Sequence, residues 1–416
     1  MSDSGNNWQS RPLGELATTT SGGTPSRKRK DYYGGTIPWV KSGELNDDYI
    51  FETEEHITEA GLKNSSAKLF QSGTVLIALY GATVGKTSIL RTDASTNQAV
   101  CGITPGPDLD AGYLRYHLIS LRRELLSHRY GGAQPNISQQ IVRNQKIAYP
   151  PLPEQKKIAH ILSTVQRAIE AQERIIQTTN ELKKALMHKL FTEGLRNEPQ
   201  KQTEIGLVPE SWEVCKVGDV AKIQSGGTPA REVAENWSGG TVPWVKTGEI
   251  NYWVIHDTEE KITPTGLANS AARLFPKGTL LMAMYGQGIT RGRVGLLGIE
   301  AATNQACASI TPTDKKLISS VFLYYFFEYH YEDLRKLGHG ANQRNMNAAL
   351  IRSFPLTFPK PDEQSSIVAA FESLDEKRVL HERKRSQLQD LFRTFLHELM
   401  TAKTRVHTVH LTIQDA

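Results

Sequence analysis

The stretch Ser21-Gly22-Gly23-Thr24-Pro25 occurs a second time in this chain, as Ser225-Gly226-Gly227-Thr228-Pro229. Further matches follow in the same order, each about 205 residues apart: Pro-Trp-Val-Lys at 38–41 and 243–246, Tyr-Gly at 80–81 and 285–286, and Thr-Asn-Gln-Ala at 96–99 and 303–306. A period of this length is far too long for a solenoid, whose repeats span about 20 to 50 residues. The sequence therefore predicts a tandem duplication of a whole domain and the segment that follows it.

Each copy divides into a globular part and a long helix. Short apolar runs at 75–79 and 279–283 are bounded by glycines, which is typical of buried strands. Further helical segments are expected around 114–129 and 322–336. We therefore expect mixed α/β (α+β) domains, in two copies that cover residues 8–151 and 212–359.

Prolines at 150, 151 and 153, and again at 359 and 361, mark the starts of two long helices, because proline is tolerated in the first helical turn. Beyond them, heptad spacing predicts two helices of about 50–60 Å that pair as an antiparallel coiled coil. The interface residues would be Ile158, Leu162, Val165, Ile169, Leu186, Leu190, Ile367, Phe371, Leu374, Leu388, Phe395 and Leu399. A pseudo-two-fold arrangement would place Ile158 near Leu399 and Ile367 near Leu190, with the heads apart. The alternative is that each helix packs on its own globular part.

These patterns predict six segments. The globular parts are residues 1–152 and 211–360, and the helices are residues 153–195 and 361–402. A linker at 196–210 joins the two copies, and a polar tail occupies 403–416.

Composition limits the class of protein. The 416 residues favour roughly two to three domains, and the 3 cysteines without a Cys-x-x-Cys pair disfavour a disulfide framework or a cysteine-rich zinc site. No apolar run approaches the roughly 20 residues that a membrane span needs, and the first residues are polar. We therefore expect a cytoplasmic protein with no membrane partner. Its 49 basic and 44 acidic side chains give a net charge of +5, a mild bias that is compatible with nucleic acid.

Glycine-rich turns and basic loops lie next to the repeated motifs, and such loops suit close contact with phosphates or base edges. The candidate DNA contacts in the first copy are Thr24, Arg27, Lys28, Arg29, Lys30, Lys41, Tyr80 and Lys86. Those in the second copy are Thr228, Arg231, Lys246, Tyr285, Gln287, Arg291 and Arg293. The alternatives are a solvated basic surface and plain hairpin turns. For Trp39 and Trp244 we favour packing over stacking on bases.

Patterns for catalysis are weak. The run Gly81-Ala82-Thr83-Val84-Gly85-Lys86-Thr87 has three residues between its glycines, whereas a phosphate-binding P-loop needs four. His407 and His410 lie in a polar tail with no carboxylate or cysteine cluster, so we expect no metal site. The sequence also has no nucleophile-elbow, zinc-protease or dinucleotide-binding signature. We therefore expect a non-catalytic chain that binds no cofactor of its own.

The duplicated motifs resemble those of the specificity subunit of type I restriction-modification systems. The resemblance rests on the motifs above, on Gly-Gly-Ala-Gln-Pro-Asn-Ile-Ser at 131–138, and on the helix starts Pro-Leu-Pro-Glu-Gln at 151–155 and Pro-Asp-Glu-Gln at 361–364. It covers essentially the whole chain. The second copy departs at 338–345, where the glycines and Asn345 remain but the proline is lost.

The resemblance implies two target-recognition domains, each of which reads one half of a split sequence in double-stranded DNA. It also implies that the helices dock two methyltransferase subunits that bind S-adenosylmethionine, and that separate restriction and translocase subunits use ATP and Mg²⁺. Two alternatives stay open from the residues alone. One is a coiled-coil adaptor that does not read DNA, and the other is a nucleotide-binding enzyme that uses the loop 81–87.

Overall fold

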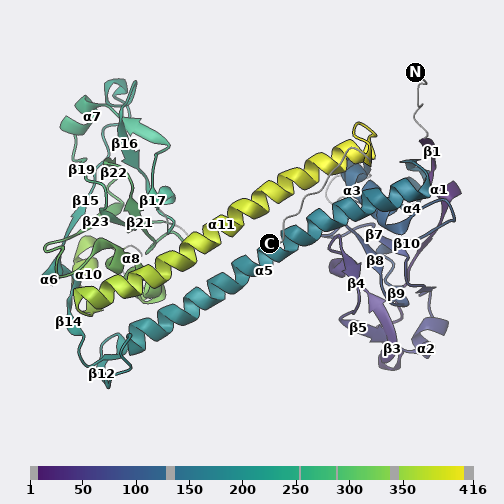
Figure 1. Cartoon of the computed structure of the whole chain (residues 1–416), viewed down its shortest axis with the longest axis horizontal. Helices are drawn as coiled ribbons and strands as arrows, with labels where there is room; N and C mark the ends of the chain where they lie inside the picture. The colour runs from purple at the N-terminus through teal and green to yellow at the C-terminus, as the bar shows by residue number, and fades with distance from the viewer. Residues whose placement is uncertain (1–7, 128–135, 253, 287–288, 338–345, 407–416) are drawn as a thin grey trace. The chain divides into compact units, whose positions relative to one another are not determined.

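The computed structural model describes residues 8–127, 136–252, 254–286, 289–337 and 346–406 (Figure 1). The chain forms two compact units: unit 1 contains residues 1–173 and 382–416, and unit 2 contains residues 174–381. Each unit therefore holds one globular head, one half of the helix that follows that head, and one half of the other long helix.

The head of unit 1 has two main sheets. The five-stranded sheet has the order β2 (Ala17–Ser21), β10 (Val100–Pro105), β7 (Val75–Ala78), β8 (Thr87–Leu90) and β4 (Tyr49–Ile50). The four-stranded sheet has the order β5 (Glu55–Ile57), β3 (Tyr33–Val40), β9 (Ala94–Thr96) and β6 (Leu69–Phe70). A separate antiparallel pair joins β1 (Gln9–Pro12) to β11 (Lys146–Tyr149). The helical elements are α1 (Leu13–Leu16), α2 (Glu59–Lys63), α3 (Ala111–Ser127), α4 (Gln139–Asn144), and the 3₁₀ turns η1 (Lys30–Tyr32) and η2 (Ser42–Glu44).

The head of unit 2 repeats this topology. Its five-stranded sheet has the order β15 (Ala221–Ser225), β23 (Cys307–Pro312), β20 (Leu280–Ala283), β21 (Val294–Leu297) and β17 (Val254–Ile255). Its four-stranded sheet has the order β18 (Glu260–Ile262), β16 (Val242–Val245), β22 (Ala301–Thr303) and β19 (Leu274–Phe275), and β14 (Glu213–Lys216) pairs with β24 (Pro355–Phe358). The helical elements are α6 (Val217–Val220), α7 (Pro264–Ala268), α8 (Ser320–Tyr329), α9 (Tyr331–Lys336), α10 (Ala348–Ser353), η3 (Ala234–Asn236) and η4 (Thr247–Glu249). The hairpin β12 (Gln200–Thr203) and β13 (Gly206–Pro209) lies in the linker.

The five-stranded sheet of each head lies next to the long helices, and the four-stranded sheet lies on the far side of that head (Figure 1). The main core of each unit lies between the first sheet and these helices. In unit 1, Val75, Ile77 and Ile103 from the sheet share a buried cluster with Leu114 from α3. A smaller cluster around Trp39 belongs to the four-stranded sheet. The apolar runs predicted as buried strands are therefore confirmed as β7 and β20.

The two long helices are α5 (Leu152–Glu193) and α11 (Pro361–Met400). α5 begins directly after Pro151, and α11 begins at Pro361, as the prolines predicted. In unit 1, Ile158 of α5 shares a buried cluster with Leu399 of α11, and in unit 2 Ile367 of α11 shares one with Leu190 of α5. Within each unit the two helix halves are therefore antiparallel, which confirms the predicted fold class of two α/β heads and two long antiparallel helices.

One detail of the secondary structure differs from the prediction. The helix expected at 322–336 is two helices, α8 and α9, because His330 leaves helical geometry with ψ of 19°. The matching segment of unit 1 continues unbroken through α3. Across the described ranges, no helix combines the length and the apolar character that crossing a bilayer requires.

Candidate nucleic-acid interface

In each head the loop Ser-Gly-Gly-Thr-Pro is held against the turn Thr-Asn-Gln-Ala. The Gly22 amide donates to Val100 O at 3.0 Å, and the Gly23 amide donates to Thr96 O at 2.9 Å. In unit 2 the corresponding amides of Gly226 and Gly227 donate at 3.3 and 2.9 Å. A Cβ at Gly22 would overlap Thr96, so this close approach of two backbones needs glycine. Two motifs far apart in sequence are thus one loop cluster.

The buried tryptophan of Pro-Trp-Val-Lys also holds the Ser-Gly-Gly-Thr-Pro loop in place. Trp39 Nε1 donates to Gly23 O at 3.1 Å, and Trp244 Nε1 donates to Gly227 O at 3.0 Å. Each tryptophan is only 2% exposed. The packing interpretation of both residues is confirmed, since a buried ring cannot stack on a base.

The glutamine of each Thr-Asn-Gln-Ala turn is a polar surface residue that was not among the predicted contacts. The Thr24 hydroxyl donates to Gln98 Oε1, and the Thr228 hydroxyl donates to Gln305 Oε1. Both glutamines are exposed, and within the described ranges neither amide nitrogen has a hydrogen-bond acceptor. An amide N–H₂ of this kind can donate to a phosphate oxygen or to a base edge. The repetition of Thr-Asn-Gln-Ala in both copies is the sequence signal that could have identified these glutamines.

Two predicted cations in each head are already paired with carboxylates. Lys41 Nζ lies 2.6 Å from Glu54 and 3.2 Å from Glu55, and Arg27 lies 2.6 Å from Glu55. In the second head Lys246 Nζ lies 2.7 Å from a Glu259 carboxylate oxygen and 3.0 Å from a Glu260 oxygen, and Arg231 pairs with Glu260. We call these two sets of four side chains the charge brackets; the members are Arg27, Lys41, Glu54 and Glu55, and Arg231, Lys246, Glu259 and Glu260. Each bracket sums to zero charge.

The arginine of each bracket also covers aromatic rings. The Arg27 guanidinium carbon lies 4.4 Å from the centre of the Tyr33 ring, and that of Arg231 lies 3.8 Å from the centre of the Trp237 ring. The hydrogen bond from Arg27 holds the pKa of the Glu55 carboxyl below its usual value, and Arg231 does the same to the pKa of Glu260. Glu55 and Glu260 therefore remain ionised near neutral pH, and their ion pairs help to fix the strand that carries the tryptophan.

The basic run beside the first bracket differs from its counterpart. Arg29 makes a bidentate pair with Asp31, at 2.9 and 2.7 Å, whereas Lys28 and Lys30 are exposed and form no ion pair within the described residues. In the second head the corresponding loop carries Glu232 and Glu235, both exposed. The two heads thus share a scaffold and present opposite charges next to it.

The glycine-rich run 81–87 is the turn of a hairpin between β7 and β8. A P-loop joins a strand to a helix, so this geometry excludes the phosphate-loop interpretation of Lys86. Gly85 N donates to Ala78 O at 2.8 Å, and Gly292 N donates to Ala283 O at 2.8 Å, with both glycines at positive φ. The Lys86 position therefore corresponds to Arg293 rather than to Arg291.

The remaining candidates around this hairpin have different surroundings. Tyr80 and Tyr285 are partly exposed, at 36% and 38%. Arg293 donates to Asn251 Oδ1, and Arg291 donates to Arg335 O at 3.1 Å, so both cations are partly engaged within the head. Gln287 lies outside the described residues, as do most of the motifs at 131–138 and 338–345.

The predicted interface residues of the long helices fall into two groups. Seven are buried: Ile158, Leu162, Val165, Leu190, Ile367, Phe371 and Leu399. The other five, which lie nearer the helix centres or on the flanks, are partly exposed: Ile169, Leu186, Leu374, Leu388 and Phe395. Of the predicted residues, the buried ones thus lie toward the helix ends, where each helix also meets a head.

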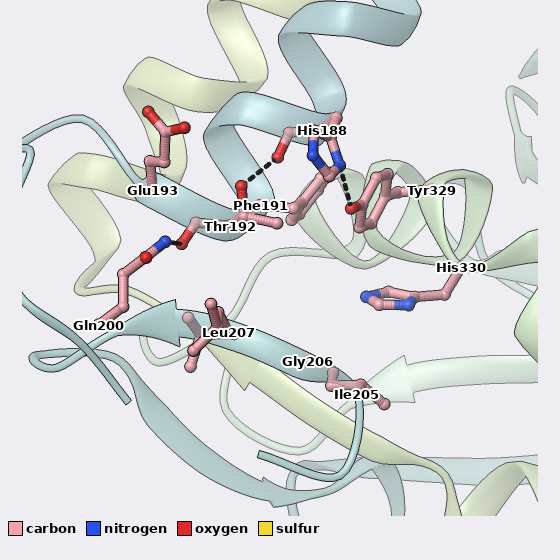
Figure 2. Close-up of a pocket in the computed structure, with 11 residues that line it drawn as sticks. His188, Phe191, Thr192, Glu193, Gln200, Ile205, Gly206, Leu207, Tyr329 and His330 are labelled. Atoms are coloured by element: carbon pink, nitrogen blue, oxygen red, sulfur yellow. Dashed lines mark hydrogen bonds between the residues drawn. The ribbon is translucent and has the colours of Figure 1, made fainter. Parts of the chain in front are cut away.

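Unit 2 contains a cavity of 440 Å³ at the end of α5, between the linker hairpin and α8. Figure 2 shows His188 and Tyr329 next to each other in the cavity lining, with His188 Nδ1 3.0 Å from the tyrosine hydroxyl. The Gln200 amide donates to Thr192 O at 2.7 Å and holds the hairpin to the helix. The cavity includes none of the repeated motifs, so it is separate from the loop cluster described above.

Cysteine and histidine give no sign of reactive chemistry in the described residues. Burial raises the pKa of the Cys101 thiol to about 12 and that of Cys215 to about 11. No group of three potential metal ligands occurs in the part of the chain that the structure describes. His407 and His410 lie outside that part.

Comparison with known proteins assigns this duplicated architecture to a family. The family "Type I restriction modification DNA specificity domain" matches residues 5–181 and 209–390. The MjaVIII specificity subunit of Methanocaldococcus jannaschii is 24% identical over 413 residues, which cover 97% of this chain and 94% of that protein. The MjaIX specificity subunit of the same organism is 28% identical over 305 residues, or 70% of this chain and 69% of that protein.

Solved structures agree on the fold. An S subunit of a type I restriction-modification system from M. genitalium matches with a TM-score of 0.65 and 16% identity, covering 95% of this chain and 97% of that one. A chain from a study of complex assembly and conformational transition of the type I R-M system matches with a TM-score of 0.54 and 16% identity, at the same coverage. The two matched regions and the shared fold show that this chain belongs to the specificity subunits of type I restriction-modification systems, the non-catalytic members of those complexes.

Proposed function

We propose that each head of this chain reads one half of a bipartite target in double-stranded DNA. The proposed target-recognition domains are residues 1–152 and 211–360, the spacer helices are 153–195 and 361–402, the linker is 196–210, and the tail is 403–416. The middle of the target would go unread.

One observation carries this proposal: the same loop cluster occurs in both heads, and the exposed charges beside it differ. The shared parts are backbone contacts and buried tryptophans, which suit a scaffold. The differing parts are surface loops, with Lys28 and Lys30 in one head and Glu232 and Glu235 in the other. Two recognition domains that share a scaffold but bind different DNA sequences need shared internal contacts and different surface loops. Contacts to the bases determine the sequence that is bound, and the scaffold only positions the loops that make them.

We assign different roles to the candidate contacts. Lys28, Lys30 and Lys86 would pair with phosphates, since none has an ion pair in the described residues. The bracket cations would hold their loops at the DNA surface. The other proposed DNA-contact residues are Thr24, Arg29, Tyr80, Thr228, Tyr285, Gln287, Arg291 and Arg293.

The helices would dock the catalytic partners. We infer that two methyltransferase subunits bind along α5 and α11, and that restriction and translocase subunits complete the assembly in the cytoplasm. S-adenosylmethionine would be held by the former, and ATP with Mg²⁺ by the latter. This chain would supply position and sequence choice, while its partners supply the chemistry.

Exchange of one head tests the proposal. Replacement of residues 8–151 by the equivalent segment of another specificity subunit should change one half of the methylated sequence and leave the other half intact. The measurement is a map of methylated bases in DNA from cells that express the complete system. An unchanged methylation pattern would favour an adaptor that does not read DNA. So would the absence of salt-dependent DNA binding even with the methyltransferase present.

A further inference from the structure

Unit 2 contains a largely buried charge network where its head meets the long helices. Lys183 of α5 lies 2.9 Å from Glu328 of α8 and 2.9 Å from Asp375 of α11. Tyr325 donates to the Asp375 carboxylate at 3.0 Å, and Arg378 lies 3.5 Å from the same carboxylate. The Lys183 side chain is 11% exposed, and those of Glu328 and Asp375 are 20% exposed. One lysine thus joins three helices.

The same site in unit 1 can be identified from shared hydrogen bonds. Gln155 accepts from the Asp110 amide, as Gln364 accepts from the Ser319 amide, which aligns α3 with α8. The Tyr116 hydroxyl donates to Gln166 at 3.0 Å, as Tyr325 does to Asp375.

The side chains at the matched positions of unit 1 are neutral. Phe392 of α11 takes the place of Lys183, and its ring packs edge-on against Tyr116 with the centroids 6.0 Å apart. Ile119 of α3 takes the place of Glu328, and both Ile119 and Phe392 pack against the main core of unit 1. Gln166 takes the place of Asp375. The two junctions therefore share one geometry and differ in charge at these three positions. Unit 1 has a buried cation of its own nearby, Arg115, whose Nη2 lies 3.5 Å from Gln166 Oε1.

We propose that the side chains at these matched positions decide which half of a long helix each head packs against. The head of unit 2 fits the half that carries Lys183, and the head of unit 1 fits the half that carries Phe392. A chain that paired two copies of the same half would bury Lys183 beside Tyr116 and Ile119, or Phe392 beside Glu328 and Asp375. Each head therefore fits only one of the two helix halves. Substitution of the other half at either junction is disfavoured.

The physical reason is the cost of an unpaired buried charge. Replacing both partners of a buried ion pair by apolar groups is often nearly neutral, whereas removing one partner is strongly destabilising. Burial already raises the pKa of Glu328, and the opposing charge of Lys183 is what favours its ionised form. A phenylalanine at position 183 would remove that opposing charge from two carboxylates at once.

Point variants of the full chain reproduce each mismatch. Lys183→Phe presents to the second head the side chain that the first head accepts, and Phe392→Lys does the reverse. Hydrogen–deuterium exchange of the α8 and α3 amides reads the two junctions separately within one molecule. We expect Lys183→Phe to accelerate exchange in Ser320–Tyr329 by at least ~10-fold and to leave Ala111–Ser127 unchanged, because two largely buried carboxylates lose the cation that lies 2.9 Å from each. Phe392→Lys should give the opposite pattern.

A combined variant separates pairing choice from general damage. Lys183→Phe with Glu328→Ile and Asp375→Gln installs the unit 1 side chains at these three matched positions of unit 2, and we expect its α8 exchange to return to within about 3-fold of the unaltered chain. Wild-type protection of α8 in Lys183→Phe would overturn the proposal. So would failure of the combined variant to recover, or unchanged α3 exchange in Phe392→Lys. If Lys183→Phe alone does not fold, recovery in the combined variant still supports the proposal.

Discussion

Removal of one carboxylate from the first charge bracket should strengthen DNA binding. Glu55 neutralises Arg27 at 2.6 Å and shares Lys41 with Glu54. Glu55→Gln keeps the shape of the side chain but leaves the bracket with one net positive charge. If that charge meets a phosphate, the slope of log K against log salt steepens by about 0.9, which corresponds to roughly 8-fold tighter binding at ~0.1 M salt.

Removal of positive charge from the neighbouring loop should have the opposite effect on DNA binding. Lys28→Gln with Lys30→Gln removes two exposed cations that form no ion pair in the described residues. Loss of two phosphate contacts would flatten the slope by about 1.8 and weaken binding roughly 60-fold at ~0.1 M salt. The expected signs are therefore opposite for two sites in the same loop region.

Fluorescence anisotropy of a labelled duplex, with the methyltransferase subunits present, measures both slopes. Glu52→Gln is the matched control, because Glu52 is exposed, lies three residues before Glu55, and makes no ion pair within the described ranges. It changes the net charge of the chain by the same amount as Glu55→Gln. Equal slopes for Glu52→Gln and Glu55→Gln would refute the placement of the bracket at the DNA surface.

Three further changes test the scaffold. Gln155→Leu should lower the free energy of unfolding in urea by at least about 3 kcal/mol, because the fully buried amide satisfies three backbone groups at 2.8–2.9 Å. Trp39→Phe loses the bond to Gly23 O and should cost about 1 kcal/mol, with faster limited proteolysis of the loop 21–30 as the readout. The pKa of Glu55 is lowered in the folded chain, so its stabilising contribution is complete above the unfolded value of about 4.3 and is lost as the pH falls below it. Tryptophan fluorescence should therefore stay constant from pH 7 to about 5 and change only in more acidic solution.

Periodicity and duplication made the architecture predictable. Apolar runs between glycines predicted β7 and β20, and heptad spacing predicted the two long helices, because burial of one face leaves a direct mark on sequence. The ends of the helix seam were also predictable, since Ile158 and Leu399 are both apolar and both buried.

The electrostatics of the site were harder to predict. Cations stand out as DNA contacts in a sequence, but Glu54 and Glu55 pair with them only after β3 and β5 come together. A signal did exist, because Glu-Glu recurs at 259–260 in the same place of the second copy. Counting cations without their repeated acidic neighbours overstates the charge of this surface.

Correspondence between the copies also depends on geometry that spacing does not reveal. The hairpin after Tyr285 is two residues longer than that after Tyr80, so Lys86 aligns with Arg293 only through the backbone bonds of Gly85 and Gly292. Loops absorb insertions at the surface, where packing imposes few constraints on length.

The turn before β4 and β17 shows what the duplication has preserved. Asp47 and Tyr252 occupy the left-handed region, with φ of 70° and 51°, and this region is unfavourable for a side chain as large as tyrosine. Their amides donate to Thr87 O at 2.8 Å and to Val294 O at 2.9 Å. The side chains differ completely, since Asp47 pairs with an arginine of α3 and Tyr252 packs edge-on against a tyrosine of α9. Both heads thus keep the strained backbone at this turn. The side chain at this position forms an ion pair in one head and an aromatic contact in the other. Because backbone bonds hold the turn in both heads, its side chains were free to diverge, and two heads with different surfaces can share one scaffold.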